Sequence, residues 1–153
     1  DTATAKKVLS EYLPYVSILF TSGGDAADVL GFTDPPGEDL ALKMSKELGI
    51  PTVCVVYGPG GTSNALWRAV CASNGKTYAA QQEGTLMTVD RLGAGDAFAG
   101  GFLTGFLEEG PELGVKMGNA VMTLKNAYQG DIAWVTRDVV DTYLAGDGGM
   151  IKR

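Results

Sequence analysis

Residues 88–101, TVDRLGAGDAFAGG, run from an apolar strand end through a glycine turn directly into a helix. Gly93 and Gly95 lack a Cβ, so the backbone there can turn sharply and come close to a ligand. A helix that begins near Asp96 leaves its first N–H groups without intrahelical partners, and its aligned peptide dipoles make that end partly positive. Phosphate groups bind well at such helix ends. The stretch therefore predicts an anion-binding turn.

The same turn carries a carboxylate placed for proton transfer. During phosphoryl transfer, negative charge spreads over the oxygens of the moving group, and N–H donors aimed at those oxygens lower the barrier. The amides of residues 93–96 are candidate donors, and Asp96 is a candidate general base for an attacking hydroxyl. A helix-capping Asp behind a tight glycine turn explains the pattern equally well. A Walker loop is excluded because no Lys-Ser or Lys-Thr pair follows the glycines, and the dinucleotide fingerprint fails because Phe98 occupies its third glycine position.

Residues 90–101, DRLGAGDAFAGG, resemble the C-terminal signature of the ribokinase-like (PfkB) carbohydrate kinases. Arg91 stands where that signature usually has Thr. This Arg and residues 130–136, GDIAWVT, resemble the sequences of the family branch that phosphorylates 2-keto-3-deoxygluconate. The resemblance extends over essentially the whole chain. It implies an α/β fold of the ribokinase-like type, with three α/β/α layers and a mostly parallel sheet. Residues 1–153 would form a single C-terminal nucleotide-binding portion, with the N-terminal half and the β-lid missing.

The resemblance also implies an activity. MgATP is expected to donate its γ-phosphoryl group to a hydroxyl of a sugar acid, converting 2-keto-3-deoxygluconate to its 6-phosphate. Asp96 would be the base in contact with the substrate, and the anion hole would be formed by Gly93, Ala94 and Gly95. Because the missing half would carry most sugar contacts and the lid that completes the site, the isolated chain is expected to be inactive or nearly so.

Two further positions are candidate substrate-binding residues. Asp131 matches a position expected to approach the substrate or close the site, although a plain turn residue would look the same. Arg91 is expected to face phosphate, and an ion pair with Asp90 is the alternative.

The ATP and Mg²⁺ positions follow from the same resemblance. The glycine-rich segment after the strand expected at residues 52–57 would pass under the nucleotide, and its candidate contacts are Gly58, Gly61 and Ser63. A flexible linker is an equally good interpretation of that segment. Asn119 would border the adenine, although an incidental Asn on a core helix accounts for it too. Asp25 falls on the family's magnesium position, but residues 22–24 depart from the family pattern, and Asp25 alone would be interpreted as a helix cap.

Apolar spacing along the chain predicts alternating helices and strands, which favours an α/β fold. Strands are expected at residues 16–20 and 52–57, and a hairpin is expected around the turn Asn74-Gly75. Helices are expected at residues 4–13, 26–30, 38–48, from Asp96 onward, at 111–128, and after Thr136 as a cap. Residues 146–153 are expected to be a frayed tail.

Composition narrows the functional class. The 153 residues are 45% hydrophobic and 20% charged, which is typical of one soluble globular domain. The net charge of −6 argues against nucleic-acid binding, and no apolar run is long enough to span a membrane. The chain has no histidine, which removes hydrolase triads built on His. Cys54 and Cys71 are expected to be buried thiols in a reducing cytoplasm. A homo-oligomer is compatible with all of this.

Three alternatives stay open at this stage. The sugar acceptor is fructose or ribose if the missing half selects a different substrate. The chain is a non-catalytic nucleotide-binding or oligomerisation module if it kept the fold and lost the chemistry. It is a truncated reading of a longer gene if the first residue, Asp1, marks a cut through the fold, and an exposed apolar edge would then favour association.

Overall fold

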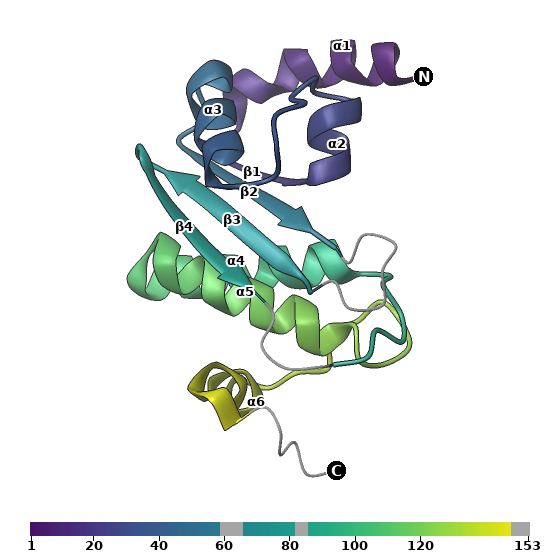
Figure 1. Ribbon diagram of the computed structural model, residues 1–153, viewed down its shortest axis with the longest axis vertical. Coiled ribbons are helices and arrows are strands. Elements are labelled where there is room, and N and C mark those ends of the chain that lie inside the picture. Colours follow the sequence, from purple (N-terminus) through teal and green to yellow (C-terminus); the bar gives the residue numbers. More distant parts are fainter. Residues whose placement is uncertain (59–65, 82–85, 148–153) are drawn as a thin grey trace. The chain divides into compact units, whose positions relative to one another are not determined.

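A computed structural model of the chain describes residues 1–58, 66–81 and 86–147 (Figure 1). The chain divides into two compact units, each with its own packing. The first unit comprises Asp1–Tyr57 and Ala69–Ala79, and the second comprises Gly58–Arg68 and Ala80–Arg153. Among the described residues, no helix is long and apolar enough to cross a membrane.

The first unit begins with helix α1, a short 3₁₀ turn and the first strand. In chain order, the elements here are α1 (Thr2–Tyr12), the turn Leu13–Tyr15, β1 (Ile18–Ser22), α2 (Gly23–Asp28), α3 (Glu38–Leu48), β2 (Thr52–Tyr57), β3 (Arg68–Ser73) and β4 (Lys76–Gln81). The expected strand at residues 16–20 therefore begins two residues later. Helix α3 and strand β2 occupy the ranges that the apolar spacing predicts.

The four strands form one sheet in the order β1-β2-β3-β4 (Figure 1). β1 and β2 are parallel, with Ile18 opposite Thr52. β2 and β3 are antiparallel, because the hydroxyl oxygens of Thr52 and Ser73 lie 2.9 Å apart while the Asn74 amide donates to the Pro51 carbonyl at 3.1 Å.

The expected hairpin joins β3 to β4. Asn74 and Gly75 both have positive φ, 49° and 79°, as a two-residue turn of this kind requires. A two-residue turn joins only antiparallel strands. The described sheet is therefore mixed, and the expected parallel pairing is found for β1 and β2.

The core of the first unit lies between α3 and the sheet. Leu40, Ala41 and Met44 on one stripe of α3 are buried in a cluster with Val53 and Val55 of β2. Gly49 ends α3 in the left-handed conformation, at φ 68°.

The two thiols lie in the same unit. Cys54 and Cys71 are buried and free, as expected. Burial raises the pKa of the Cys54 thiol, so the thiol stays protonated and unreactive.

The second unit is helical. Its elements are α4 (Ala94–Glu109), α5 (Pro111–Lys125), α6 (Arg137–Thr142) and a final turn over Tyr143–Asp147. Thr136 occupies the N-cap position of α6 but makes no side-chain cap hydrogen bond. Residues 148–153 of the expected tail lie outside the described residues.

Helices α4 and α5 pack along each other at glycines (Figure 1). A Cβ added to Gly101 would lie 2.8 Å from the Met117 carbonyl oxygen, and one added to Gly105 would lie 2.8 Å from the Leu113 carbonyl. Glycine at these two positions therefore permits the close packing of α4 and α5.

Candidate functional site

The turn that leads into α4 is held by the side chain of Asp90. Its Oδ1 accepts a hydrogen bond from the Leu92 amide and its Oδ2 accepts one from the Gly130 amide, each at 3.0 Å. These two bonds, in that order of importance, lower the pKa of Asp90. The Asp90 carbonyl accepts from Nζ of the fully buried Lys125 at 2.9 Å. The alternative considered for Arg91, an ion pair with Asp90, is absent from the described residues, and the Asp90 carboxylate accepts backbone amides instead.

Gly93 is glycine for a reason internal to the protein. It has φ 77°, and a Cβ built on it would lie 2.0 Å from the Asp131 carbonyl oxygen. The backbone of the Asp131 turn therefore packs directly on the turn before α4. The Ala94 amide donates to the Arg91 carbonyl at 3.1 Å, so one of the three predicted anion-hole donors is engaged within the turn.

Gly95 has the opposite surroundings. A Cβ built there would meet no atom within 4 Å, and both Gly95 and Asp96 are exposed. Gly93, at the N-cap of the 16-residue α4, has no side chain that could accept a bond from the first-turn amides. First-turn amides of a helix have no intrahelical acceptor. The Gly95 and Asp96 amides therefore lack an intrahelical acceptor, and because both residues are exposed, an anion can approach this turn.

Asp96 and Asp131 line the same pocket, which has a volume of about 400 Å³. Side chains of α4, α5 and α6 form its largely apolar walls, among them Met117, Val121 and Val140. The structure thus brings together two of the predicted substrate residues. A pocket with apolar walls and a few convergent polar groups is the usual form of a small-molecule site.

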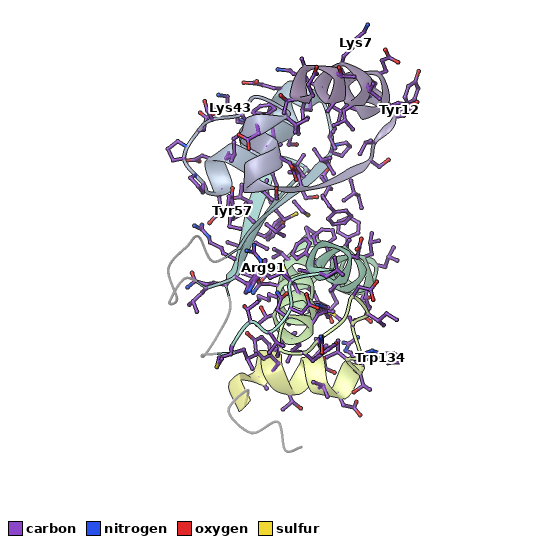
Figure 2. The ribbon with its side chains drawn as sticks, turned by 90° about the vertical axis from the view of Figure 1, so that its right-hand side faces the viewer. Lys7, Tyr12, Lys43, Tyr57, Arg91 and Trp134 are labelled. Carbon is purple, nitrogen blue, oxygen red and sulfur yellow. The ribbon has the colours of Figure 1, made fainter. Side chains whose placement is uncertain are left out.

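Arg91 does not line this pocket and contacts other residues. Its guanidinium carbon is 5.1 Å from the centre of the Trp67 ring, and the added Cβ at Gly58 would be 2.6 Å from Arg91 Nη2. Figure 2 labels Arg91 on the segment that leads into α4. Sequence reasoning missed Trp67 as a functional candidate, and only its size and polar edge in an otherwise glycine-rich neighbourhood could have drawn attention to it.

Asn119 is buried on α5, and its Oδ1 has no hydrogen-bond partner. Thr123 Oγ1 and both side-chain polar atoms of Asn126 are likewise unpartnered, and the three residues follow one stripe of the helix. A buried polar atom without a partner costs free energy, so this stripe calls for a bound group or water. The sequence could identify Asn119 only through its family resemblance.

Asp25 belongs to the first unit, at the start of α2. The Asp25 amide donates to Ser22 Oγ at 3.0 Å, and Ser22 Oγ donates to Asp25 Oδ2 at 2.7 Å. Ser22 is therefore the N-cap, and the interpretation of Asp25 as the cap is wrong because its carboxylate reaches back from the third helical position. Among the described residues no group of three metal-binding side chains occurs. Gly61 and Ser63 lie outside the described residues.

These features fit one family. A family model described as pfkB family carbohydrate kinase matches residues 1–138, and the chain belongs to this family. The match runs from α1 into α6 and includes the turn at Gly93, the first turn of α4 and the Asp131 turn.

Individual relatives refine the comparison. The 2-dehydro-3-deoxygalactonokinase of Haloferax volcanii is 31% identical over 150 residues, which cover 97% of this chain and 44% of the relative. The structure of 2-dehydro-3-deoxygluconokinase from Thermotoga maritima matches with a TM-score of 0.83 at 23% identity, covering 95% of this chain and 46% of that one. An Escherichia coli ribokinase II candidate, solved with ATP and Mg²⁺, matches with a TM-score of 0.72 at 20% identity, covering 92% and 43%.

The structural matches confirm the ribokinase-like α/β fold expected from the sequence. The chain spans less than half the length of each of these relatives.

Proposed function

We propose that a full-length protein containing this chain transfers the γ-phosphoryl group of ATP to a hydroxyl of 2-keto-3-deoxygluconate and forms the 6-phosphate. The observation that carries the proposal is the open first turn of α4. There the exposed Asp96 carboxylate lies beside unpartnered helix amides and lines a pocket of about 400 Å³.

Asp96 acts in this reaction as the general base. It accepts the proton of the attacking hydroxyl as the new P–O bond forms and the bond between the γ-phosphorus and the ADP oxygen breaks, so that ADP leaves. The sequence predicts that the amides of Gly93, Ala94 and Gly95 form the anion hole. The geometry supports the Gly95 and Asp96 amides as its donors, because the Ala94 amide already has an acceptor. Donors fixed before the reaction stabilise the developing charge without reorganisation.

The acceptor lies in the pocket that Asp96 shares with Asp131. The Asp131 carboxylate accepts hydrogen bonds from sugar hydroxyls, and its backbone fixes Gly93. Arg91 binds a negatively charged group of one of the substrates. In this proposal the base and the acceptor hydroxyl share one pocket, and the cation belongs to the segment before α4.

The remaining candidate residues are proposed to bind ATP and Mg²⁺. Asn119 presents an unpartnered buried oxygen that suits an amino group such as that of adenine, and Gly58, Gly61 and Ser63 are the further residues proposed to contact the nucleotide. Asp25 contributes one carboxylate to Mg²⁺, which commonly binds through one or two carboxylates and the substrate phosphates. When bound, the ion neutralises charge on the phosphates.

A second acceptor is favoured by one observation. The Haloferax volcanii relative, at 31% identity, is named for 2-dehydro-3-deoxygalactonate, which differs from the gluconate compound in the configuration of one carbon. The Thermotoga maritima match is named for the gluconate compound. Both are sugar acids with a terminal primary hydroxyl, so the proposed chemistry at Asp96 is the same.

The test is a coupled ADP-release assay on the full-length protein. The acceptors are 2-keto-3-deoxygluconate, its galactonate epimer, fructose and ribose, each with MgATP. We expect kcat/KM to be highest for one of the two sugar acids. A preference for fructose or ribose would replace the acceptor, and binding of MgATP without turnover of any acceptor would favour the non-catalytic module.

The cellular setting is part of the same proposal. Cys54 and Cys71 are unpaired, as is usual where thiols are kept reduced, and ATP-dependent sugar chemistry takes place in the cytoplasm. A homo-oligomer is compatible with this role, and size-exclusion chromatography with light scattering on the full-length protein tests it.

A further inference from the structure

The side chain of Arg91 is held in place by an aromatic ring. Its guanidinium carbon lies 5.1 Å from the centroid of Trp67, within the range of a cation–π contact. Trp67 is itself fixed, because it is only 5% exposed and its Nε1 donates to Thr88 Oγ1 at 3.3 Å. The aromatic face therefore restricts the cation to one region of the turn.

Gly58 packs closely against both Arg91 and Trp67. A Cβ built on Gly58 would lie 2.6 Å from Arg91 Nη2 and 3.2 Å from two carbons of the Trp67 ring. Any side chain at this position would displace the guanidinium. Gly58 and Trp67, nine positions apart between β2 and β3, thus meet Arg91 from the turn before α4, and none of the three residues lines the pocket of Asp96.

The charge of Arg91 is available to a ligand. Within the described chain, the ion pairs engage Lys43, Lys116 and Arg137, whereas no carboxylate pairs with Arg91. Arg91 is exposed, and its carbonyl accepts the Ala94 amide, which ties the residue to the start of α4. In a chain of net charge −6, a fixed and unneutralised guanidinium is a specific feature rather than part of a basic surface.

We propose that Arg91 is the binding residue of an oxyanion site and that Trp67 is its positioning residue. A guanidinium presents several N–H donors in a rigid fork that matches the oxygens of a phosphate or a carboxylate. Holding the fork in advance lowers the entropy lost on binding. The source of the oxyanion, a nucleotide phosphate or the carboxylate of a sugar acid, rests on the proposed function; the anion site itself does not.

The fluorescence of Trp67 can report the binding of an oxyanion at this site. The chain has two tryptophans, and Trp134 is 77% exposed, so Trp134→Phe leaves Trp67 as the single tryptophan, whose emission is excited selectively at wavelengths that tyrosine does not absorb (Figure 2). In this background the 153-residue chain is titrated at constant ionic strength with inorganic triphosphate, with gluconate and with glucose as a neutral sugar.

We expect a saturable change in Trp67 emission with triphosphate or with gluconate and none with glucose. A response to triphosphate assigns the site to the nucleotide phosphates, and a response to gluconate assigns it to the acceptor carboxylate. Arg91→Gln is expected to weaken the apparent affinity at least about tenfold, since a hydrogen-bonded charge is lost. Lys76→Gln, which removes the same charge from the exposed hairpin, is the matched control and should leave the affinity unchanged.

The positioning role needs a separate measurement, made by calorimetric titration with the oxyanion that responds. Trp67→Phe keeps an aromatic face and should retain most of the affinity, whereas Trp67→Leu should lose about three- to thirtyfold. The two variants are compared under conditions in which urea unfolding curves show that both are fully folded. Equal affinity for Trp67→Leu and the unsubstituted chain would overturn the positioning role.

Absence of any saturable response, or a response that Arg91→Gln leaves intact, would overturn the site itself. If the site binds an oxyanion while the full-length protein turns over no acceptor, the proposed function fails and the anion site stands. The two failures are therefore distinguishable.

Discussion

Gly93 and Gly95 stand two positions apart and are glycine for different physical reasons. The Gly93 backbone is left-handed and packs against the Asp131 carbonyl, whereas nothing of the protein approaches Gly95. The sequence predicts that both positions need glycine in an anion-binding turn. It cannot predict which one serves a ligand, because the Asp131 turn reaches Gly93 only in the folded chain.

Alanine substitution separates the two roles. Gly93→Ala adds a Cβ that strains a left-handed residue and overlaps the Asp131 carbonyl, so we expect a loss of more than about 2 kcal/mol in the free energy of unfolding. The matched control Gly95→Ala should be neutral or stabilising by up to about 1 kcal/mol. Urea unfolding followed by circular dichroism measures both. Equal stability of the two variants would contradict the packing of Gly93.

Gly95→Ala carries a second expectation in the full-length protein. Its Cβ would project into the space assigned to the transferred phosphoryl group, so turnover should fall although stability does not. A coupled ADP-release assay measures this, and unchanged kcat would show that no ligand approaches Gly95 closely.

Asp90 makes the stability of the turn pH-dependent. Hydrogen bonds from the Leu92 and Gly130 amides lower its pKa in the folded chain. A lowered pKa means that the ionised carboxylate stabilises the fold above the pKa of the unfolded chain, about 3.9, and that this contribution is lost as the pH falls through the folded-state pKa.

Asp90→Asn is therefore expected to lower the urea midpoint near pH 7 and to match the unsubstituted chain more closely at about pH 3. Glu109→Gln, whose carboxylate has no hydrogen bond among the described residues, is the control and should show no such convergence. A constant difference between Asp90→Asn and the unsubstituted chain across this range would exclude the Asp90 carboxylate as the group that titrates.

At the scale of elements, apolar spacing predicts helices and strands better than it predicts their ends. α3 and β2 match their predicted ranges because a continuous apolar stripe or run is bounded by Gly49 or by a glycine loop. α5 ends at Lys125, three residues before the predicted end, and the carbonyl of the next residue, Asn126, accepts the Val89 amide at 2.7 Å instead of an amide of a continuing helix. Such a long-range bond leaves no periodic signal in the sequence.

The glycine contacts between α4 and α5 are a second feature at this scale. Gly105→Ala places a Cβ 2.8 Å from the Leu113 carbonyl, which belongs to the backbone and cannot rotate away. We expect a loss of about 1–3 kcal/mol in the free energy of unfolding. Gly100→Ala on the same helix meets no atom within 4 Å and should stabilise by up to about 1 kcal/mol. A neutral Gly105→Ala in urea unfolding would mean that the helices can separate without cost.

At the scale of the whole molecule, the chain spans less than half the length of the relatives it matches. The family could be predicted from residues 90–101 because that signature is long and combines turn, helix and carboxylate in one segment. The acceptor could not be predicted in the same way, since Asp131 and Arg91 are only two proposed contacts for a whole sugar acid.

The isolated 153-residue chain is therefore expected to show no acceptor-dependent ADP release above the rate with ATP alone. The physical reason is that a kinase site needs groups that position the acceptor and exclude water, in addition to the base and the anion hole. The measurement is the same coupled assay on the isolated chain and on the full-length protein in parallel. Substantial phosphorylation of a sugar acid by the isolated chain would refute this expectation.

The most direct test of the account is Asp96→Asn in the full-length protein, with turnover of its best acceptor and binding of MgATP measured on the same preparation. Asp138→Asn, in the first turn of α6, is the matched control. We expect Asp96→Asn to lower kcat by at least about a hundredfold, as removal of a general base does, while the Kd for ATP changes little. Turnover within about tenfold of the unsubstituted enzyme would contradict the assignment of Asp96 as the base.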